Sequence, residues 1–450
     1  DIHNRFILSM VFDINIYHIV YYDISTNECY QDSISIDNIM TKLLQIKPVE
    51  IITNNDTLLN SHIMKILNSI NFKNVSIVEI DNIHGIKKDY PVLILKKYLY
   101  NNKVTLDQLD ILDNKGEMYM KMNPNTLLNL NLEELIKILN NTQTRMGYRI
   151  LYKNILNPLN NYNMIKIQLN NTKFFYEYKD INKLKINIQD LRKIVNNIKN
   201  EKDLKILSNN LNYSIKFIES IQDLPHYFIL KFQKCNNLPI IQLINTNIND
   251  SYEYNNQIIN KLSKDLDDIL IAMDSYSQGK VKNNNLIGFF IETKVTQNVP
   301  NDYILKQGMV NCKRYTSPTL LKLETDFNNI KEQIDIHKKN IFNMIYKETI
   351  HYKNNIELLS DLIGEIDFYI SNALNAINYN YYMPEIIDNI HEQFIDVDCG
   401  RHPIIERHKT FVSNSFIGNL QHRITLITGP NMGERERREV AVAVLVLRRD

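Results

Sequence analysis

The segment RITLITGPNMG at residues 423–433 has a spacing that could bind a nucleotide, because an apolar run ends there in a glycine-initiated turn. In a GxxxxGK(S/T) loop, backbone N–H groups wrap a phosphate, and a lysine and a hydroxyl meet the terminal phosphates and Mg²⁺. Counting from Gly429, the second glycine, the lysine and the hydroxyl residue are replaced by Glu434, Arg435 and Glu436. Carboxylates repel a polyphosphate. We therefore expect this loop to bind ATP poorly and the chain alone not to hydrolyse it.

The residues that follow the loop, 434–450, differ in composition from the rest of the chain. They contain five arginines, against eight in the preceding 433 residues, and none of the Asn, Ile, Lys and Tyr that crowd those residues. Such an abrupt change inside a motif favours a truncation or a frameshift, with a divergent phosphate loop as the alternative. The first residues, DIHNRF, lack an initiator methionine, so we expect the chain to be incomplete at that end as well.

Longer sequence words accompany the loop and make its ancestry specific. They are MYMKMNPNTLLNLNL (118–132), NNTQTRMGYRILYKNILNPL (140–159), GFFIE (288–292), RYTSPTLLKLE (314–324), GRHPIIE (400–406), FVSN (411–414) and TGPNMG (428–433). In this order and spacing, the words resemble the MutS family of DNA mismatch-repair proteins.

The resemblance implies a mainly α chain with α/β parts. It assigns an α/β connector domain to residues 1–116, a core and lever domain of long helices to 117–250, a clamp with flanking helices to 251–345, a returning lever helix to 346–395, and a truncated P-loop (ABC-type) ATPase domain to 396–450. The family's mismatch-reading domain, with its Phe-x-Glu wedge, is not expected in this chain. The Walker-B carboxylate and the family's signature loop are not expected after Gly433 either.

Hydrophobic periodicity in the first half of the chain predicts the strands and helices that make up these segments. Runs of β-branched and aromatic residues predict strands at 6–13, 16–25 and 47–53, and a helix at 36–46 lies among them. Strands that alternate with helices indicate a compact α/β unit. Apolar residues at intervals of three and four then predict amphipathic helices, for example at 132–140 and 186–200.

The pattern in the second half of the chain predicts a small sheet between two long helices. Helical patterns at 258–273 and 321–350 flank a strand pattern at 286–295, which suits a protruding tip. Further on, a heptad seam predicts a long helix packed against a neighbour, and Pro384 ends the helical pattern. The seam consists of Leu359, Ile363, Ile366, Ile370, Ala373 and Ile377.

The resemblance also assigns nucleotide-contacting residues. Phe411 matches the family aromatic that stacks on adenine, and Asn414 lies where a polar contact to the base is expected. A buried phenylalanine at a strand edge is the alternative for Phe411. The phosphate cradle would consist of Gly429, Pro430, Asn431, Met432 and Gly433, with ATP or ADP and Mg²⁺ as the family's cofactors. We expect His402 to be a hydrogen-bonded structural histidine.

Lys294, Gln297 and Asn298 follow the predicted clamp strand in a polar turn that ends at Pro300. Lysine and amide side chains can hold phosphate oxygens without reading sequence, so these three are the candidate DNA contacts. Solvated loop residues are the alternative. Arg314 lies in the word at the junction between clamp and lever and is not expected to contact DNA.

Composition limits the partners. The net charge of +1 gives no overall basic excess that would indicate nucleic-acid binding, so any DNA contact must come from a local group of residues. Cys29, Cys235, Cys312 and Cys399 lie far apart without metal spacing, which favours reduced, buried thiols in an intracellular protein, nuclear or cytoplasmic. No apolar run is long enough to span a membrane, so no membrane partner is expected.

By resemblance, the partners are mismatched double-stranded DNA, a second MutS-type subunit in a homo- or heterodimer, and a MutL-type protein. The ring-forming ancestor would exchange ADP for ATP to become a sliding clamp on DNA. A meiotic-type MutS homologue that binds recombination junctions, and a non-catalytic helical scaffold, are the alternative functions.

Overall fold

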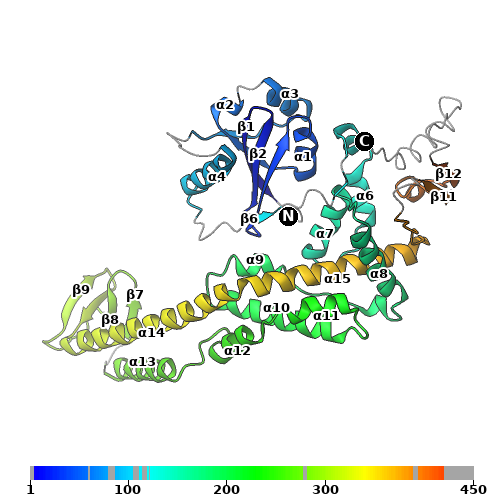
Figure 1. The fold of residues 1–450 in the computed structure, drawn as a ribbon. Helices are drawn as coiled ribbons and strands as arrows, with labels where there is room; N and C mark the ends of the chain where they lie inside the picture. Colours follow the sequence, from blue (N-terminus) through cyan, green and yellow to red (C-terminus); the bar gives the residue numbers. More distant parts are fainter. Residues whose placement is uncertain are drawn as a thin grey trace. The chain divides into compact units, whose positions relative to one another are not determined.

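The computed structural model divides the chain into two compact units. The first unit comprises residues 1–196, 214–234 and 357–450, and the second comprises residues 197–213 and 235–356. Figure 1 follows the chain from the blue N-terminal strands to the orange helix α15. The structure describes residues 5–58, 61–79, 87–104, 111–113, 119–120, 122–276, 281–388 and 394–419.

A mixed six-stranded sheet, in the order β5-β4-β1-β2-β3-β6, opens the first unit. Its strands are β1 (Phe6–Asp13), β2 (Ile16–Asp23), β3 (Glu28–Ser35), β4 (Glu50–Thr53), β5 (Val75–Ile77) and β6 (Ile111–Asp113). The pairs β1–β2 and β2–β3 are antiparallel, whereas β4, β5 and β6 join in parallel. The predicted strands β1, β2 and β4 are confirmed, but sequence analysis missed β3.

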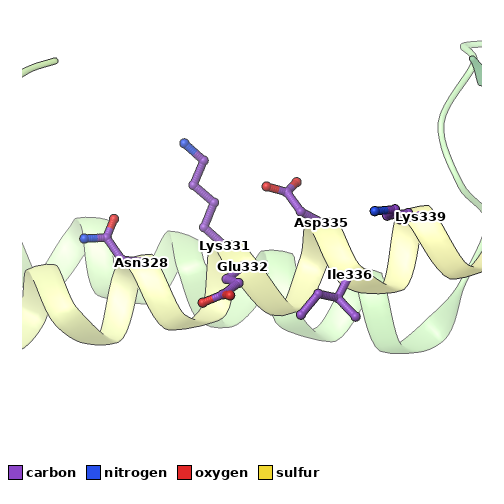
Figure 2. Close-up of a pocket in the computed structure, with 6 residues that line it drawn as sticks. All are labelled: Asn328, Lys331, Glu332, Asp335, Ile336 and Lys339. Atoms are coloured by element: carbon purple, nitrogen blue, oxygen red, sulfur yellow. The ribbon is translucent and has the colours of Figure 1, made fainter.

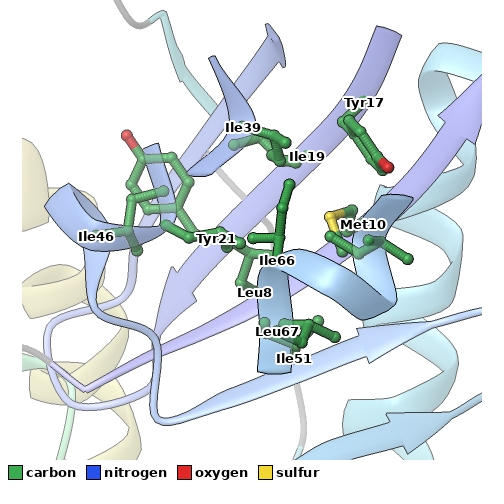
Figure 3. Packing of buried hydrophobic residues seen from close by; sticks show 12 residues of the cluster. Leu8, Met10, Tyr17, Ile19, Tyr21, Ile39, Ile46, Ile51, Ile66 and Leu67 are labelled. Carbon is green, nitrogen blue, oxygen red and sulfur yellow. The ribbon is translucent and has the colours of Figure 1, made fainter. Parts of the chain in front are cut away.

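Helices cover both faces of this sheet. On one face, Leu8, Met10 and Ile19 pack with residues of α1 (Ile39–Ile46) and α3 (Ser61–Ser69), as Figure 3 shows. On the other face, Ile7 and Val11 pack with α4 (Tyr90–Asn101). Successive residues of a strand point to opposite faces, so burial of both faces explains why β1 is apolar almost throughout. The short helix α2 (Asn55–Leu58) and the 3₁₀ turn η1 (Lys87–Asp89) complete this part.

The rest of the first unit is largely helical. It contains α5 (Pro124–Asn129), α6 (Leu132–Leu139), α7 (Arg145–Leu156), α8 (Tyr162–Glu177), η3 (Ile181–Lys183), α9 (Leu191–Val195), α11 (His226–Gln233) and most of α15 (Lys353–Tyr379). Five of the six predicted seam residues of α15 are fully buried, whereas Ile377 is 38% exposed. The seam therefore ends one turn earlier than the sequence predicts.

The helix predicted at residues 186–200 is wrong for most of its length. Only Leu191–Val195 is helical, while Ile186 and Ile188 are buried but lie outside any helix or strand. Asp190 explains the late start of α9, because its carboxylate accepts the Lys193 N–H as an N-cap and also pairs with Arg149. A capping residue begins a helix, so the apolar spacing before it does not extend the helix backwards.

The second unit contains a four-stranded antiparallel sheet, in the order β7-β8-β10-β9, between two long helices. Its strands are β7 (Val281–Asn284), β8 (Gly288–Lys294), β9 (Ile304–Gly308) and β10 (Cys312–Thr316). Helix α13 (Gln257–Tyr276) precedes the sheet and α14 (Pro318–His351) follows it, as the sequence predicted (Figure 1). The unit also holds α12 (Leu238–Asn247) and the first part of α10 (Glu201–Ser220).

The core of this sheet faces the two helices. Phe289 and Ile291 of β8 are buried with Met273 of α13 and Leu320 of α14. The Phe289 ring meets Phe327 of α14 edge to face, with centroids 5.1 Å apart. One face of the sheet is therefore fixed to the helices, and the opposite face remains for polar side chains.

Near the end of the described chain, β11 (Ile395–Gly400) and β12 (Asn414–Gly418) form an antiparallel pair around the 3₁₀ turn η4 (Ile405–Arg407). The described chain is mostly helical with some sheets, which agrees with the predicted fold class at that level. Gly429, Pro430, Asn431, Met432 and Gly433 lie outside the described residues, so the truncated P-loop ATPase part and the five-segment division stay predictions. Among the described residues, no helix has the length and apolar character that crossing a membrane requires.

Candidate nucleic-acid interface

The three candidate DNA contacts lie together at one end of the second unit's sheet. Lys294 is the last residue of β8, and Gln297 and Asn298 lie in the segment that follows. All three side chains are exposed, and the Gln297 N–H donates to the Lys294 carbonyl oxygen (3.0 Å), which closes the turn. The structure therefore brings the predicted contacts onto a single exposed turn.

The face of β8 that carries Lys294 has a net positive charge. Glu292, two residues earlier, points to the same face. Its Oε1 pairs with Lys282 Nζ (2.6 Å), and its Oε2 pairs with Arg314 Nε (3.2 Å). Lys282, which contributes most, and Arg314 hold the pKa of Glu292 below its usual value. Two cations share one carboxylate here, so Lys294 adds to an existing positive excess.

Arg314 is occupied within the sheet. Besides Glu292, its Nη1 donates to Gln307 Oε1 (2.9 Å), and its guanidinium lies 4.6 Å from the centre of the Phe290 ring. These contacts join β8, β9 and β10 across the polar face. They agree with the expectation that Arg314 has a structural place at the junction; that it makes no contact to DNA stays a prediction.

A network that sequence analysis missed fixes the sheet to α14. The carboxylate of Glu324 accepts the Phe289 N–H at Oε1 (3.0 Å) and receives Lys306 Nζ at Oε2 (3.3 Å). Lys306 Nζ also donates to the carbonyl oxygens of Ile287 (2.9 Å) and Phe289 (3.0 Å). One side chain of α14 thereby holds the first residues of β8 and, through Lys306, strand β9.

Gly288 is the residue that makes this network possible. Its φ of +69° lies in the left-handed region, and an added Cβ would overlap Glu324 Oε1. The words GFFIE and RYTSPTLLKLE begin and end with these two residues. Both residues could be found from these words in the sequence, but the contact between Gly288 and Glu324 could not.

The candidate nucleotide residues are only partly described. Phe411 is half-buried, and its ring centroid lies 6.5 Å from that of His402. Asn414 opens β12, and its Nδ2 donates to the Val412 carbonyl oxygen (3.1 Å). Both residues therefore lie in one short segment next to η4. The predicted phosphate cradle lies outside the described residues.

His402 has the structural role that the sequence predicts. The residue is 7% exposed, and its Nδ1 accepts the N–H groups of Ile404 (3.2 Å) and Ile405 (3.3 Å) at the start of η4. Burial lowers the pKa of His402, because it disfavours the charged imidazolium. A neutral imidazole with an unprotonated Nδ1 is the form that can accept these bonds.

The cysteines are free thiols, but they are not uniformly buried as predicted. Cys29 and Cys235 are buried, whereas Cys312 is half-buried on β10 and Cys399 is exposed on β11. Cys399 has a φ of +51° and lies at the register shift between β11 and β12, which turns it away from a packed face.

A hollow of about 310 Å³ lies along α14, where Figure 2 shows its lining side chains spread along the helix and pointing in several directions. Its two lysines are balanced by one glutamate and one aspartate, so it presents no excess charge to an anion. The lining residues are Asn328, Lys331, Glu332, Asp335, Ile336 and Lys339. The hollow is a mixed-charge helix surface, and the turn at Lys294 is the better candidate for nucleic acid.

The described chain is mostly helical, with a small antiparallel sheet between two long helices and exposed lysine and amide side chains in the turn that follows β8. Comparison with known proteins is more specific, because the family model for MutS domain III matches residues 104–373, which is more than half of the chain. The chain belongs to the MutS family.

Its curated relatives include three bacterial proteins named DNA mismatch repair protein MutS. The Thermotoga neapolitana protein is 28% identical over 349 residues, covering 70% of this chain and 43% of the relative. The Petrotoga mobilis protein is 27% identical over 498 aligned positions, covering 95% and 60%. The Borrelia garinii protein is 25% identical over 395 positions, covering 78% and 45%. The chain thus spans about half the length of the curated relatives it matches.

Proposed function

We propose that this chain is the DNA-embracing middle of a MutS protein that acts in DNA mismatch repair. In this role the sheet of the second unit is the clamp, and the turn with Lys294, Gln297 and Asn298 holds the phosphate backbone. Membership of the MutS family and the exposure of all three side chains on one turn support the assignment. The exposed turn that follows β8 is the observation that carries it.

The chemistry of the turn fits phosphate binding without sequence reading. A lysine and two amide-bearing side chains supply N–H donors, and such donors fix a protein's position on a duplex without distinguishing its bases. The positive excess formed by Lys282 and Arg314 around Glu292 would add an attractive field next to the turn. The chain would therefore hold DNA of any sequence, and affinity for a mismatch would come from elsewhere in the complete protein.

The nucleotide role is a separate part of the proposal. In a complete protein, ATP or ADP with Mg²⁺ would occupy the loop that begins at Gly429, with Phe411 stacked on the base and Asn414 beside it. Nucleotide exchange would then shift the clamp between two arrangements and give an ATP-dependent sliding clamp. Because Glu434 and Glu436 stand where the loop needs glycine and a hydroxyl, we expect no ATP hydrolysis from this chain.

The proposed partners are mismatched double-stranded DNA, a second MutS-type subunit and a MutL-type protein. The relatives' name, DNA mismatch repair protein MutS, supports a repair role for those proteins, and the proposal extends it to this chain. Dimerisation would place two clamps around one duplex.

Titration of the 450-residue chain with matched and mismatched duplexes at two salt concentrations tests the proposal. We expect weak binding that falls steeply as salt rises and is equal for the two duplexes, because counterion release from phosphates dominates such contacts. Failure to bind any duplex at low salt would contradict the DNA role. A preference for the mismatched duplex would mean that the recognition function lies within this chain after all.

A further inference from the structure

Helix α15 carries a buried polar stripe in addition to its hydrophobic seam. The stripe consists of Asp367, Ser371 and Asn375, which are 0%, 0% and 3% exposed. Residues four apart share one face of a helix, so the three side chains point the same way. Buried polar groups destabilise a fold unless they are hydrogen-bonded, and these three have partners in one short segment of backbone.

Asp367 binds the residues that begin α7. Its Oδ1 accepts the Gln143 N–H (2.9 Å), and its Oδ2 accepts the Thr144 N–H (2.8 Å) and the Thr144 hydroxyl (2.7 Å). Thr144 is itself the N-cap of α7 and accepts the Gly147 N–H (2.9 Å). A carboxylate at this position also meets the positive end of the helix dipole.

Ser371 and Asn375 bind the residues that end α6. Ser371 Oγ accepts the Asn141 N–H (3.0 Å), and Asn375 Nδ2 donates to the Leu139 carbonyl oxygen (2.7 Å). The side chains of Asn141 and Asn375 are also bonded to each other (2.9 Å). The stripe therefore holds the whole connection from Leu139 to Thr144.

Two glycines let α7 and α15 approach closely enough for these bonds. An added Cβ at Gly147 would overlap the Asp367 carboxylate, and an added Cβ at Gly364 would lie 3.0 Å from the Met146 carbonyl group. Both are shorter than ordinary van der Waals contact, and the second involves backbone. The close approach and the polar stripe are therefore parts of one arrangement.

We propose that Asp367, Ser371 and Asn375 form a polar strap that fastens the α6–α7 connection to α15, so that α15 and α7 move as one rigid body. A hydrophobic seam alone can repack, whereas directional bonds from buried side chains to backbone groups specify one arrangement. In the proposed function, a displacement of α15 would then pass directly into α7. The strap itself does not depend on that function, because all its contacts lie within this chain.

Residue-resolved amide hydrogen exchange on the 450-residue chain tests the strap. Asp367→Ala removes both carboxylate oxygens that accept the N–H groups of Gln143 and Thr144, so we expect both amides to exchange about tenfold to a hundredfold faster, as expected when hydrogen bonds to a buried charge are lost. Ile370→Val, a buried seam change on the same helix, is the matched control. It should leave the ratio of these two rates to those of the other core amides unchanged.

Equal acceleration of Gln143 and Thr144 in both variants, or no acceleration in Asp367→Ala, would overturn the proposal. If Asp367→Ala does not fold, Ser371→Ala provides the second variant, which should accelerate Asn141 selectively. Exchange is read without DNA or nucleotide, so a failed DNA titration leaves this test intact.

A glycine substitution tests the geometry independently. Gly147→Ala should lower the thermal midpoint in the wild-type chain, because the new methyl group overlaps Asp367. In an Asp367→Gly background the overlapping carboxylate and Cβ are both removed, and the same substitution should have little further effect. Additive losses in the two backgrounds would show that Asp367 does not occupy the position assigned to it.

Discussion

Replacement of Gly288 by alanine should destabilise the attachment of the second unit's sheet to α14. The residue has a φ of +69°, and its missing side chain leaves the space that Glu324 Oε1 fills. Alanine would both strain the backbone and displace the carboxylate from the Phe289 N–H, which it accepts at 3.0 Å. The change therefore acts on the attachment of β8 to α14.

The magnitude follows from these two effects. A left-handed backbone costs an L-residue about 1–2 kcal/mol, and loss of a hydrogen bond to a charged group costs about 1.5–3 kcal/mol. Reduced freedom of the unfolded chain offsets about 0.4–1 kcal/mol. A net loss of about 2–4 kcal/mol corresponds to local opening that is roughly 30-fold to 700-fold more frequent, since each 1.4 kcal/mol is tenfold.

Amide exchange of Phe289 and Ile291 in β8 measures this loss directly, and it does not require the two units to unfold together. Gly308→Ala is the matched control, because Gly308 lies in β9 of the same sheet and has no atom within 4 Å of an added Cβ. We expect the control to change exchange by less than about threefold, on the scale of ordinary surface changes. The reasoning is refuted if Gly288→Ala and Gly308→Ala have equal effects. It is also refuted if Gly288→Ala costs as much in a Glu324→Ala background.

Three further predictions concern the first unit. The pKa of His402 is lowered in the folded chain, so the free energy of unfolding should fall as the pH drops below about 6.5, the pKa of histidine in the unfolded chain. His402→Asn, which keeps a hydrogen-bond acceptor, should flatten that part of a curve of stability against pH. Ellman's reagent should modify Cys399 first and Cys29 only on unfolding, because Cys29 is buried and its pKa is raised to about 12; rapid modification of Cys29 in the folded chain would contradict its placement. Arg192→Ala should destabilise the chain by about 2–4 kcal/mol in chemical denaturation, somewhat less than for a fully buried pair, because it removes a buried cation that pairs with Glu357 and the half-exposed Asp361; a loss below about 0.5 kcal/mol would refute this.

Apolar periodicity predicted the strands and helices that bury an apolar face. The strands β1, β2 and β4, the sheet between α13 and α14, and the seam of α15 all follow from patterns within single segments. Strand β3 was missed because its sequence ECYQDSIS is largely polar, and pairing with β2 and β6 makes it a strand. Tertiary context overrode local preference there.

Contacts between distant residues explain what sequence reading did not find. Asp367 and Gln143 are 224 positions apart, and no pattern within α15 distinguishes Asp367 from a solvent-exposed aspartate. The words containing Gly288 and Glu324 were recognised, but the reason for the glycine required the structure. By contrast, the exposed turn at Lys294 was predicted in place, because polar residues before a proline form a local signal.

The central claim is that the turn at Lys294 holds the DNA backbone, and the salt dependence of duplex binding tests it most directly. Lys294→Ala should weaken binding and reduce the slope of log affinity against log salt by about 0.9, the value for one lost phosphate contact. Lys264→Ala removes the same charge from an exposed position on α13 and serves as the control. The account predicts an unchanged slope for that control. Equal slopes for Lys294→Ala and the wild-type chain would contradict it.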